Sequence, residues 1–138
     1  MIKLPGKENM NYSLQYELQN YPDIPHIIVV EYYNETAKHH KLLQLELSHQ
    51  DKTIGYQLDS ACIIDNNQEH FCCVLHINEK EYAFEGASHK RLEPFKWTSL
   101  LNRDENWTFK GTNVDVSVKD TYQWNFTKGY SMLFYYRN

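Results

Sequence analysis

Three short apolar runs, separated by turn-forming residues, limit the possible folds of this chain. The runs cover residues 54–64, 71–77 and 82–84, and they are rich in β-branched or aromatic side chains. The sequence DNNQE separates the first two runs, and NEKE separates the last two. Because short runs of this composition bounded by turn residues are typical of paired strands, the segment predicts a meander of three antiparallel strands.

Similar runs extend this pattern along most of the chain. Residues 13–18 and 114–118 alternate between apolar and polar side chains, which is typical of half-buried strands. Residues 42–47 fit a strand or a helix equally well, and only residues 97–103 read as a short helix. The other expected strands include continuous apolar runs, which predict that several strands are covered on both faces. They are residues 26–33, 107–110, 122–126 and 130–136.

The whole chain of 138 residues is expected to form one α+β domain that is predominantly antiparallel β, with little helix. No internal repeat or shift in composition marks a boundary, and the hydrophobic content of 41% is enough for an ordinary core. Residues 1–13 contain no apolar signal segment, and no run approaches the length that spans a membrane. A membrane is therefore not an expected partner.

The charge of the chain also limits its expected partners. The formal net charge is −4, whereas domains that bind nucleic-acid phosphates usually carry an excess of positive charge. A basic cluster at residues 89–91 is too small to reverse this expectation. The sequence also lacks a glycine-rich phosphate loop. We therefore expect neither a nucleic-acid partner nor a cofactor.

The cysteines bear on the compartment in which the protein works. Cys62, Cys72 and Cys73 cannot all be paired within one chain, and all three lie in apolar runs. We therefore expect buried, reduced thiols, which fit a cytoplasmic or nuclear location. Because neighbouring strand residues point to opposite faces, Cys72 and Cys73 should face opposite ways. Secretion is a minor alternative because Asn-x-Ser/Thr sequences occur at Asn11, Asn34, Asn106 and Asn125.

One row of potential metal ligands occurs in the chain. His70, Cys72 and His76 would share one face of the strand expected at residues 71–77. Such a row spreads over more than about 10 Å, whereas zinc ligands converge within about 2.0–2.3 Å of the ion. His70 and Cys72 are also two residues apart along the strand, so their Cα atoms are separated by roughly 7 Å and their side chains run parallel. This geometry is unfavourable for a catalytic dyad. We expect neither a metal site nor this local dyad.

A histidine and a glutamate form the remaining candidate site. His70 begins one expected strand and Glu85 ends the next, so a hairpin that turns near Asn78 would bring them side by side. An imidazole oriented by a carboxylate is the usual partner of a catalytic cysteine, because the imidazole removes the thiol proton. Cross-strand pairs of this kind are also common on protein surfaces without any catalytic role.

Four segments occur in an informative order. They are YPDIPHIIVVEYY at residues 21–33, YQLDSACIID at 56–65, EHFCCVLHINEKEYAFEG at 69–86 and GYSMLFYYRN at 129–138. Together they resemble the C-terminal half of a ubiquitin-specific protease domain, a papain-like cysteine peptidase. The third segment falls where the His box of that family lies. Its histidine is followed by Phe, which is more similar to the transposon-borne and SUMO-directed relatives than to the large ubiquitin proteases. The resemblance implies a papain-like, palm-type sheet.

By this resemblance, His70 would be the general base and Glu85 the acid that orients it. Tyr82 and Phe84 would form the aromatic run that leads to the acid. Glu85 stands where the family carries Asp or Asn, which adds a methylene group to a contact that depends on distance. The candidate catalytic residues implied by the resemblance are therefore His70 and Glu85.

Further departures from the family affect the expected activity. Glu69 replaces the glycine before the histidine, and Gly86 replaces a second acidic residue. The family's nucleophilic cysteine lies in an N-terminal box, together with the residue that completes the oxyanion hole. Residues 1–11 contain no cysteine, and all three cysteines fall in segments that match the palm-type half. We therefore expect no thiol proteolysis by this chain unaided.

Three functions remain open on the sequence alone. The first is a non-catalytic, protease-derived module that binds another protein, either a ubiquitin-like protein or an assembly partner. The second is a fragment or split half of an active ubiquitin- or SUMO-specific cysteine peptidase, whose cysteine is on another segment. The third is an unrelated, glycosylated β domain. The absent cysteine box favours the first.

Overall fold

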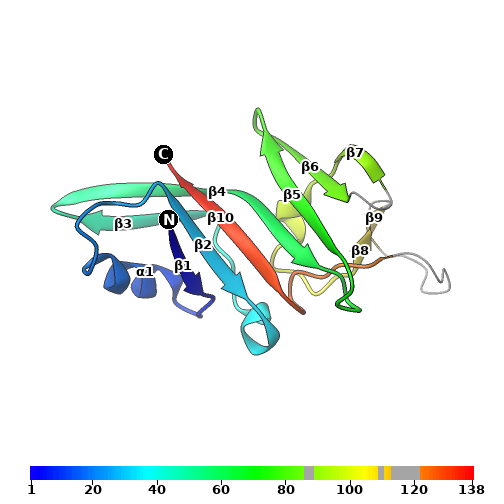
Figure 1. Ribbon diagram of the computed structural model, residues 1–138, viewed down its shortest axis with the longest axis horizontal. Helices are drawn as coiled ribbons and strands as arrows, with labels where there is room; N and C mark the ends of the chain where they lie inside the picture. Colours follow the sequence, from blue (N-terminus) through cyan, green and yellow to red (C-terminus); the bar gives the residue numbers. More distant parts are fainter. Residues whose placement is uncertain (86–88, 109–110, 113–121) are drawn as a thin grey trace.

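The computed structural model describes residues 1–85, 89–108, 111–112 and 122–138. An eight-stranded sheet runs through it in the order β1-β2-β10-β4-β5-β6-β7, and β3 pairs with part of β4 (Figure 1). The β1–β2 pair is parallel, and the other pairs of this sheet are antiparallel. The predicted α+β fold, mainly antiparallel and with little helix, is confirmed.

The elements have the following bounds. The sheet consists of β1 (Ile2–Pro5), β2 (Ile27–Tyr32), β3 (Gln44–His49), β4 (Lys52–Ile64), β5 (Phe71–Ile77), β6 (Lys80–Glu85), β7 (His89–Pro94) and β10 (Ser131–Arg137). The helical elements are α1 (Met10–Leu18) and the 3-10 helices η1 (Asn34–Lys38) and η2 (Trp97–Leu100). Strands β8 (Trp107–Thr108) and β9 (Gly111–Thr112) form a second, two-stranded sheet.

The predicted meander is present as β4, β5 and β6. In the second hairpin Ile77 pairs with Lys80, so only Asn78 and Glu79 form the turn. Both turn residues have positive φ, 51° and 67°, as in the type I′ turns that match the twist of the strands. The strands predicted at residues 26–33 and 130–136 are also confirmed, as β2 and β10.

The segment at residues 13–18 is helical, and its prediction as a strand was wrong. Met10, Leu14 and Leu18 are spaced by four residues, and all three are buried. This spacing places them on one face of a helix, although SLQYEL by itself reads as alternation. Upstream, the side chain of Asn9 accepts a hydrogen bond from the Tyr12 amide and caps the first turn. The cap and the longer spacing determine the structure here.

Other predictions are confirmed only in part. The ambiguous residues 42–47 overlap strand β3, and the helix predicted at 97–103 is the shorter η2. Of the strand predicted at residues 107–110, the first two residues form β8, and the other two lie outside the described residues. The strand predicted at residues 114–118 also lies outside the described residues. The strand predicted at residues 122–126 is wrong, because an isolated bridge from Trp124 to Trp107 replaces it.

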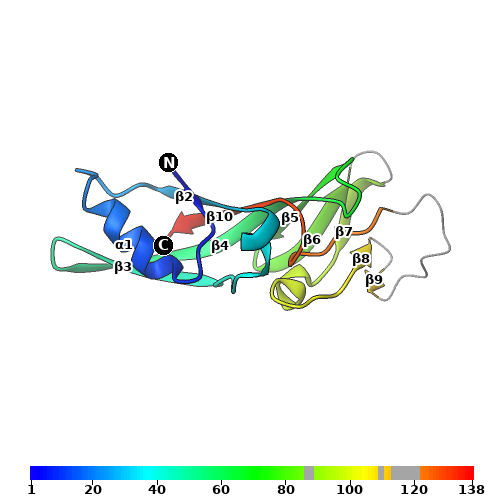
Figure 2. The same ribbon diagram turned by 90° about the horizontal axis from the view of Figure 1, so that it is seen from below.

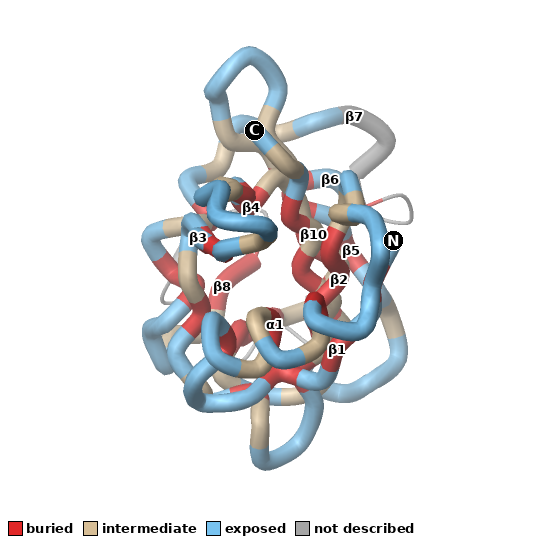
Figure 3. The backbone as a smooth tube through the Cα atoms, turned by 90° about the vertical axis from the view of Figure 1, so that its left-hand side faces the viewer, coloured by how far each residue is buried: buried red, intermediate tan, exposed pale blue. Residues whose placement is uncertain are grey.

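The core lies on the face of the sheet that carries α1, η2 and β8–β9. Helix α1 contacts β3, and η2 contacts β6 (Figure 2). Trp97, Trp107 and Trp124 are almost completely buried. Trp97 and Trp107 pack against Phe126, and Trp124 stacks on Trp107. In the tube view, buried segments of β2, β10 and β8 border the middle of the molecule (Figure 3). The large apolar residues of this face thus stabilise the sheet from one side.

The opposite face of the central strands is only partly covered. Phe71 of β5 is 49% exposed and Phe84 of β6 is 37% exposed. The expectation that several strands are covered on both faces is therefore wrong for β5 and β6, although it is met at β2, where Ile28, Val29 and Val30 are all buried. We call this surface the outer face; it consists of Cys62, Ile64, Phe71, Cys73, Phe84 and Met132, which neighbour one another in the strand register.

A buried lysine fixes the chain between η1 and β3. Lys41 is 1% exposed, and its ammonium group donates hydrogen bonds to the carbonyl oxygens of Ala37 and His39. The same group lies 4.6 Å from the centroid of the Tyr32 ring. Burial lowers the pKa of Lys41 to about 8. The lysine therefore closes the end of η1, but its charged form is costly in this position.

Because of Lys41, we expect the free energy of unfolding to rise by about 2 kcal/mol between about pH 8 and about pH 10. In the unfolded chain a lysine keeps its proton up to about pH 10.4, whereas folded Lys41 releases it near pH 8. The unfolded state thus binds more protons in this window, so stability increases with pH. Urea denaturation at several pH values measures the slope. A Lys41→Met variant with the same slope as the unmodified protein would contradict the assignment.

Candidate functional site

The structure brings His70 and Glu85 together. His70 directly precedes β5, Glu85 is the last residue of β6, and these strands pair with Cys73 opposite Phe84. The imidazole Nε2 of His70 is in hydrogen-bond contact with Oε1 of Glu85. The Glu85 side chain is fully buried, whereas that of His70 is 26% exposed. A buried carboxylate therefore holds a partly exposed imidazole at the edge of the core.

Two other residues position the histidine. The ring of Tyr122 stacks on the imidazole of His70, with centroids 4.7 Å apart and planes inclined by 24°. The buried Asp65 carboxylate accepts hydrogen bonds from the amides of His70 and Glu69, both at 2.7 Å, and from the Asn67 amide at 3.1 Å. Sequence reasoning missed both residues. For Asp65 a signal existed, since Asp followed by two Asn residues is typical of a turn closed by its own side chain.

The thiol on the same face as the histidine is not a nucleophile. Cys72 lies two residues after His70 along the chain, and it is 1% exposed. Burial raises the pKa of Cys72 well above its usual value, and the negative charges of Cys73, Glu85 and Asp65 raise it further. Because only the thiolate attacks, Cys72 remains inert near neutral pH.

The thiol with the lowered pKa lies on the other face of the sheet. Cys73 is exposed and belongs to the outer face, since adjacent strand residues point in opposite directions. The sulfurs of Cys62 and Cys73 are in hydrogen-bond contact at 3.6 Å, and this contact lowers the pKa of Cys73 to about 7. All three cysteines are free thiols, as predicted, but only Cys72 is buried. No cysteine of the chain thus has both a lowered pKa and a position on the face of the sheet that carries His70.

The histidine within β5, His76, packs against the core. The ring of His76 packs against Trp97, with centroids 5.1 Å apart, and its Nδ1 lies 2.9 Å from the carbonyl oxygen of Asp59. Across the residues that the structure describes, no group of three or more His, Cys, Asp and Glu side chains is placed to hold a metal ion. The row of His70, Cys72 and His76 does not converge on one point.

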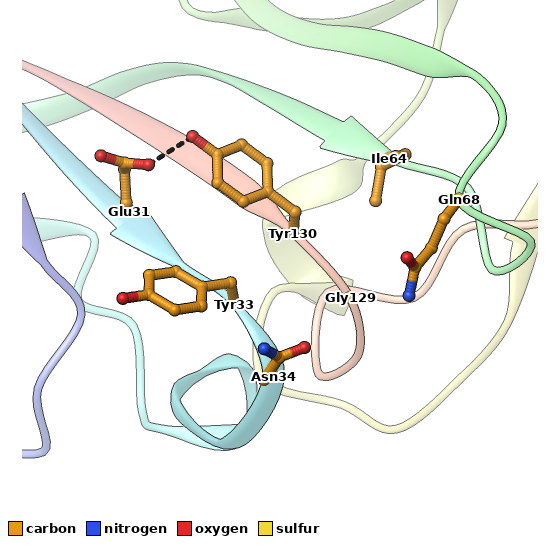
Figure 4. Close-up of a pocket in the computed structure, with 7 residues that line it drawn as sticks. All are labelled: Glu31, Tyr33, Asn34, Ile64, Gln68, Gly129 and Tyr130. Carbon is orange, nitrogen blue, oxygen red and sulfur yellow. Dashed lines mark hydrogen bonds between the residues drawn. The ribbon is translucent and has the colours of Figure 1, made fainter.

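A pocket opens beside the outer face. It has a volume of about 500 Å³, and its mouth is bordered by polar groups of β2 and of the segment before β10 (Figure 4). The Tyr130 hydroxyl donates to Oε2 of Glu31 at 2.5 Å, and this bond, together with Lys3, lowers the pKa of Glu31. Phe71 meets the Tyr130 ring edge-on at 6.1 Å, which joins the pocket to the outer face. The lining residues are Glu31, Tyr33, Asn34, Ile64, Gln68, Gly129 and Tyr130.

The four potential glycosylation sequences differ in their surroundings. Asn11 and Asn34 are exposed, whereas Asn125 is 1% exposed. The amide nitrogen of Asn125 donates to Asp104 at 2.8 Å and to Asn106 at 3.1 Å, so it is not accessible to a glycan in the folded protein. Within the described ranges, the helices are too short or too polar to cross a membrane.

No model of a known protein family matches the chain, and no curated protein is significantly similar to it. The His70–Glu85 contact and the distribution of the thiols therefore carry the functional interpretation.

Proposed function

We propose that this chain is a non-catalytic, protein-binding module built on the palm-type half of a papain-like, ubiquitin-specific protease fold. One observation carries the proposal. The histidine and carboxylate lie in contact as a peptidase would require, yet the thiol on their face, Cys72, is buried and remains protonated. A base and its orienting acid without an ionisable thiol beside them cannot generate a nucleophile. This combination supports a module that binds without catalysing a reaction.

The outer face supports binding as the remaining activity. Phe71 and Phe84 expose aromatic surface on neighbouring strands, and aromatic side chains are enriched at protein interfaces. The adjacent pocket adds the Glu31 carboxylate and the Tyr33 ring. An apolar centre bordered by polar groups is the usual composition of an interface. The choice of a ubiquitin-like protein as partner rests on the family resemblance alone.

Calorimetric titration of the chain with ubiquitin and with a SUMO-type protein tests the proposal. We expect saturable binding to one of them, and a loss of affinity of about tenfold or more in Phe71→Ser, because it removes an aromatic anchor. Tyr12→Ser is the matched control, since Tyr12 is an aromatic residue that is 71% exposed on α1, away from the outer face.

Two results would contradict the proposal. The first is the absence of binding to both proteins, which would remove the ubiquitin-like partner. The second is an equal loss of affinity in Phe71→Ser and Tyr12→Ser, which would show that the outer face does not make the contact. Circular dichroism of both variants establishes that each is folded.

The second candidate is one half of an active, ubiquitin- or SUMO-specific peptidase. It is favoured by one detail of the contact: Glu85 engages Nε2 of His70, which leaves Nδ1 for a cysteine on another segment. A ubiquitin-type probe with a C-terminal electrophile should then label that cysteine when both segments are present. Loss of labelling in His70→Ala is expected, and labelling that persists would show that His70 is not the base.

A further inference from the structure

Two cysteines of the outer face lie directly opposite each other on neighbouring strands. Cys62 of β4 pairs with Cys73 of β5, and their sulfur atoms are 3.6 Å apart. The amide of Ile64 donates to Tyr130 on the β10 side, whereas the amide of Asp65 donates to His70 on the β5 side. Successive residues of a strand direct their backbone hydrogen bonds alternately toward its two neighbouring strands. Cys62 is two residues before Ile64, so it also bonds toward β10. The Cys62–Cys73 pair is therefore a non-hydrogen-bonded pair.

This register permits a disulfide without rebuilding the sheet. Cα atoms of non-hydrogen-bonded pairs are about 4.5 Å apart, within the range of about 4.4–6.8 Å that disulfides span. The sulfurs are 3.6 Å apart, and a bond of about 2.05 Å requires them to approach by about 1.5 Å. Side-chain rotation and a small shift between the two strands supply a movement of this size.

The pair is accessible and chemically asymmetric. Cys73 is exposed and Cys62 is partly exposed, so a small reagent reaches the pair from solvent. The Cys62 and Cys73 sulfurs are in hydrogen-bond contact, and this contact lowers the pKa of Cys73, the more exposed of the two thiols. Cys73 is therefore the attacking sulfur, and Cys62 is the second thiol that resolves the intermediate. Cys72 is buried on the opposite face and takes no part.

We propose that Cys62 and Cys73 form a thiol oxidation site, at which a small disulfide such as oxidised glutathione converts the pair into a cross-strand disulfide. The Cys73 thiolate attacks one sulfur of the reagent, forms a mixed disulfide and releases one glutathione thiolate. Cys62 then loses its proton and attacks the Cys73 sulfur, which releases the second glutathione. Two protein thiols are oxidised and one reagent disulfide is reduced to two thiols. The two cysteines belong to the outer face, but their reaction with the reagent does not require that this face binds a protein.

The test treats the reduced protein with oxidised glutathione near neutral pH, stops the reaction with acid and measures intact mass, free thiols and linked peptides. We expect the three thiols to fall to one and the protein to lose two hydrogens without retaining glutathione. Cys62→Ser should stop at a stable glutathione adduct on Cys73, because the resolving thiol is missing. Cys72→Ser is the matched control and should still form the disulfide.

Several outcomes would overturn the proposal. They are a stable glutathione adduct in the unmodified protein, a bond that includes Cys72, a bond between two chains, or three thiols that remain free after treatment. The same reaction in urea serves as a control for folding. In urea, Cys72 should compete with the neighbouring Cys73, so a mixture of disulfides is expected. If the native protein gives the same mixture of disulfides as the unfolded protein, the strand register does not direct the reaction.

Discussion

Asp65→Ala is expected to lower the free energy of unfolding by about 3–5 kcal/mol, since it removes three hydrogen bonds to a buried carboxylate. The side chain of Asp65 is fully buried, and the amides of Asn67, Glu69 and His70 all donate to it. Alanine leaves these donors without their acceptor in the turn between β4 and β5. The turn also sets the position of His70, so its loss should affect the site as well as stability.

Asp65→Asn distinguishes hydrogen bonding from a general effect of substitution. Oδ1 of Asp65 accepts from Glu69 and His70, whereas Oδ2 accepts only from Asn67. An asparagine that keeps its oxygen at the Oδ1 position loses only the bond to Asn67, so we expect a cost of about 1 kcal/mol. Urea denaturation of the three proteins measures both effects. Equal losses in the two variants, or a loss below about 1 kcal/mol for alanine, would show that Asp65 does not organise the turn.

The His70–Glu85 contact is expected to have a coupling energy of about 1–3 kcal/mol in a double-mutant cycle of His70→Ala and Glu85→Ala. Glu85 is fully buried, so solvent screens this contact little on one side. The partial exposure of His70 keeps the expected value below that of a fully buried ion pair. Denaturation of the four proteins at one pH gives the coupling directly.

The chain offers a matched control for this cycle. His39 and Glu8 form another imidazole–carboxylate pair, with Nε2 and Oε1 3.7 Å apart, but the Glu8 side chain is 85% exposed. Exposed pairs contribute little, so we expect no measurable coupling between His39 and Glu8. A similar coupling in both cycles would mean that burial does not strengthen the His70–Glu85 contact, and the interpretation of the site would fail.

The meander and its contact site could be predicted because local signals agree there. Turn residues bound the strands, the second hairpin has a two-residue turn, and His70 and Glu85 lie at comparable distances from it. The alternating segment does not predict helix α1, because the buried residues of the helix begin at Met10, before that segment. A short stretch of sequence cannot distinguish the period of a strand from that of a helix when the positions of its apolar residues agree with both.

The properties of the three thiols depend on the strand register, which the sequence does not supply. The apolar run around Cys62 and the run around Cys73 predict burial, yet both residues face the partly covered side of the sheet. Their proximity also requires that β4 and β5 pair with these two positions opposite each other. Likewise, Tyr122 reaches His70 only through tertiary packing. Contacts of this kind follow from the path of the chain rather than from local composition.

A ubiquitin-type or SUMO-type probe with a C-terminal electrophile shows whether His70 activates any thiol of this chain. The unmodified protein and His70→Ala are incubated with the probe, and mass spectrometry of the peptides identifies the modified cysteine. We predict no adduct at Cys72 in either protein. An adduct at Cys72 that forms in the unmodified protein and disappears in His70→Ala would show that the chain supplies its own nucleophile, and it would contradict the account.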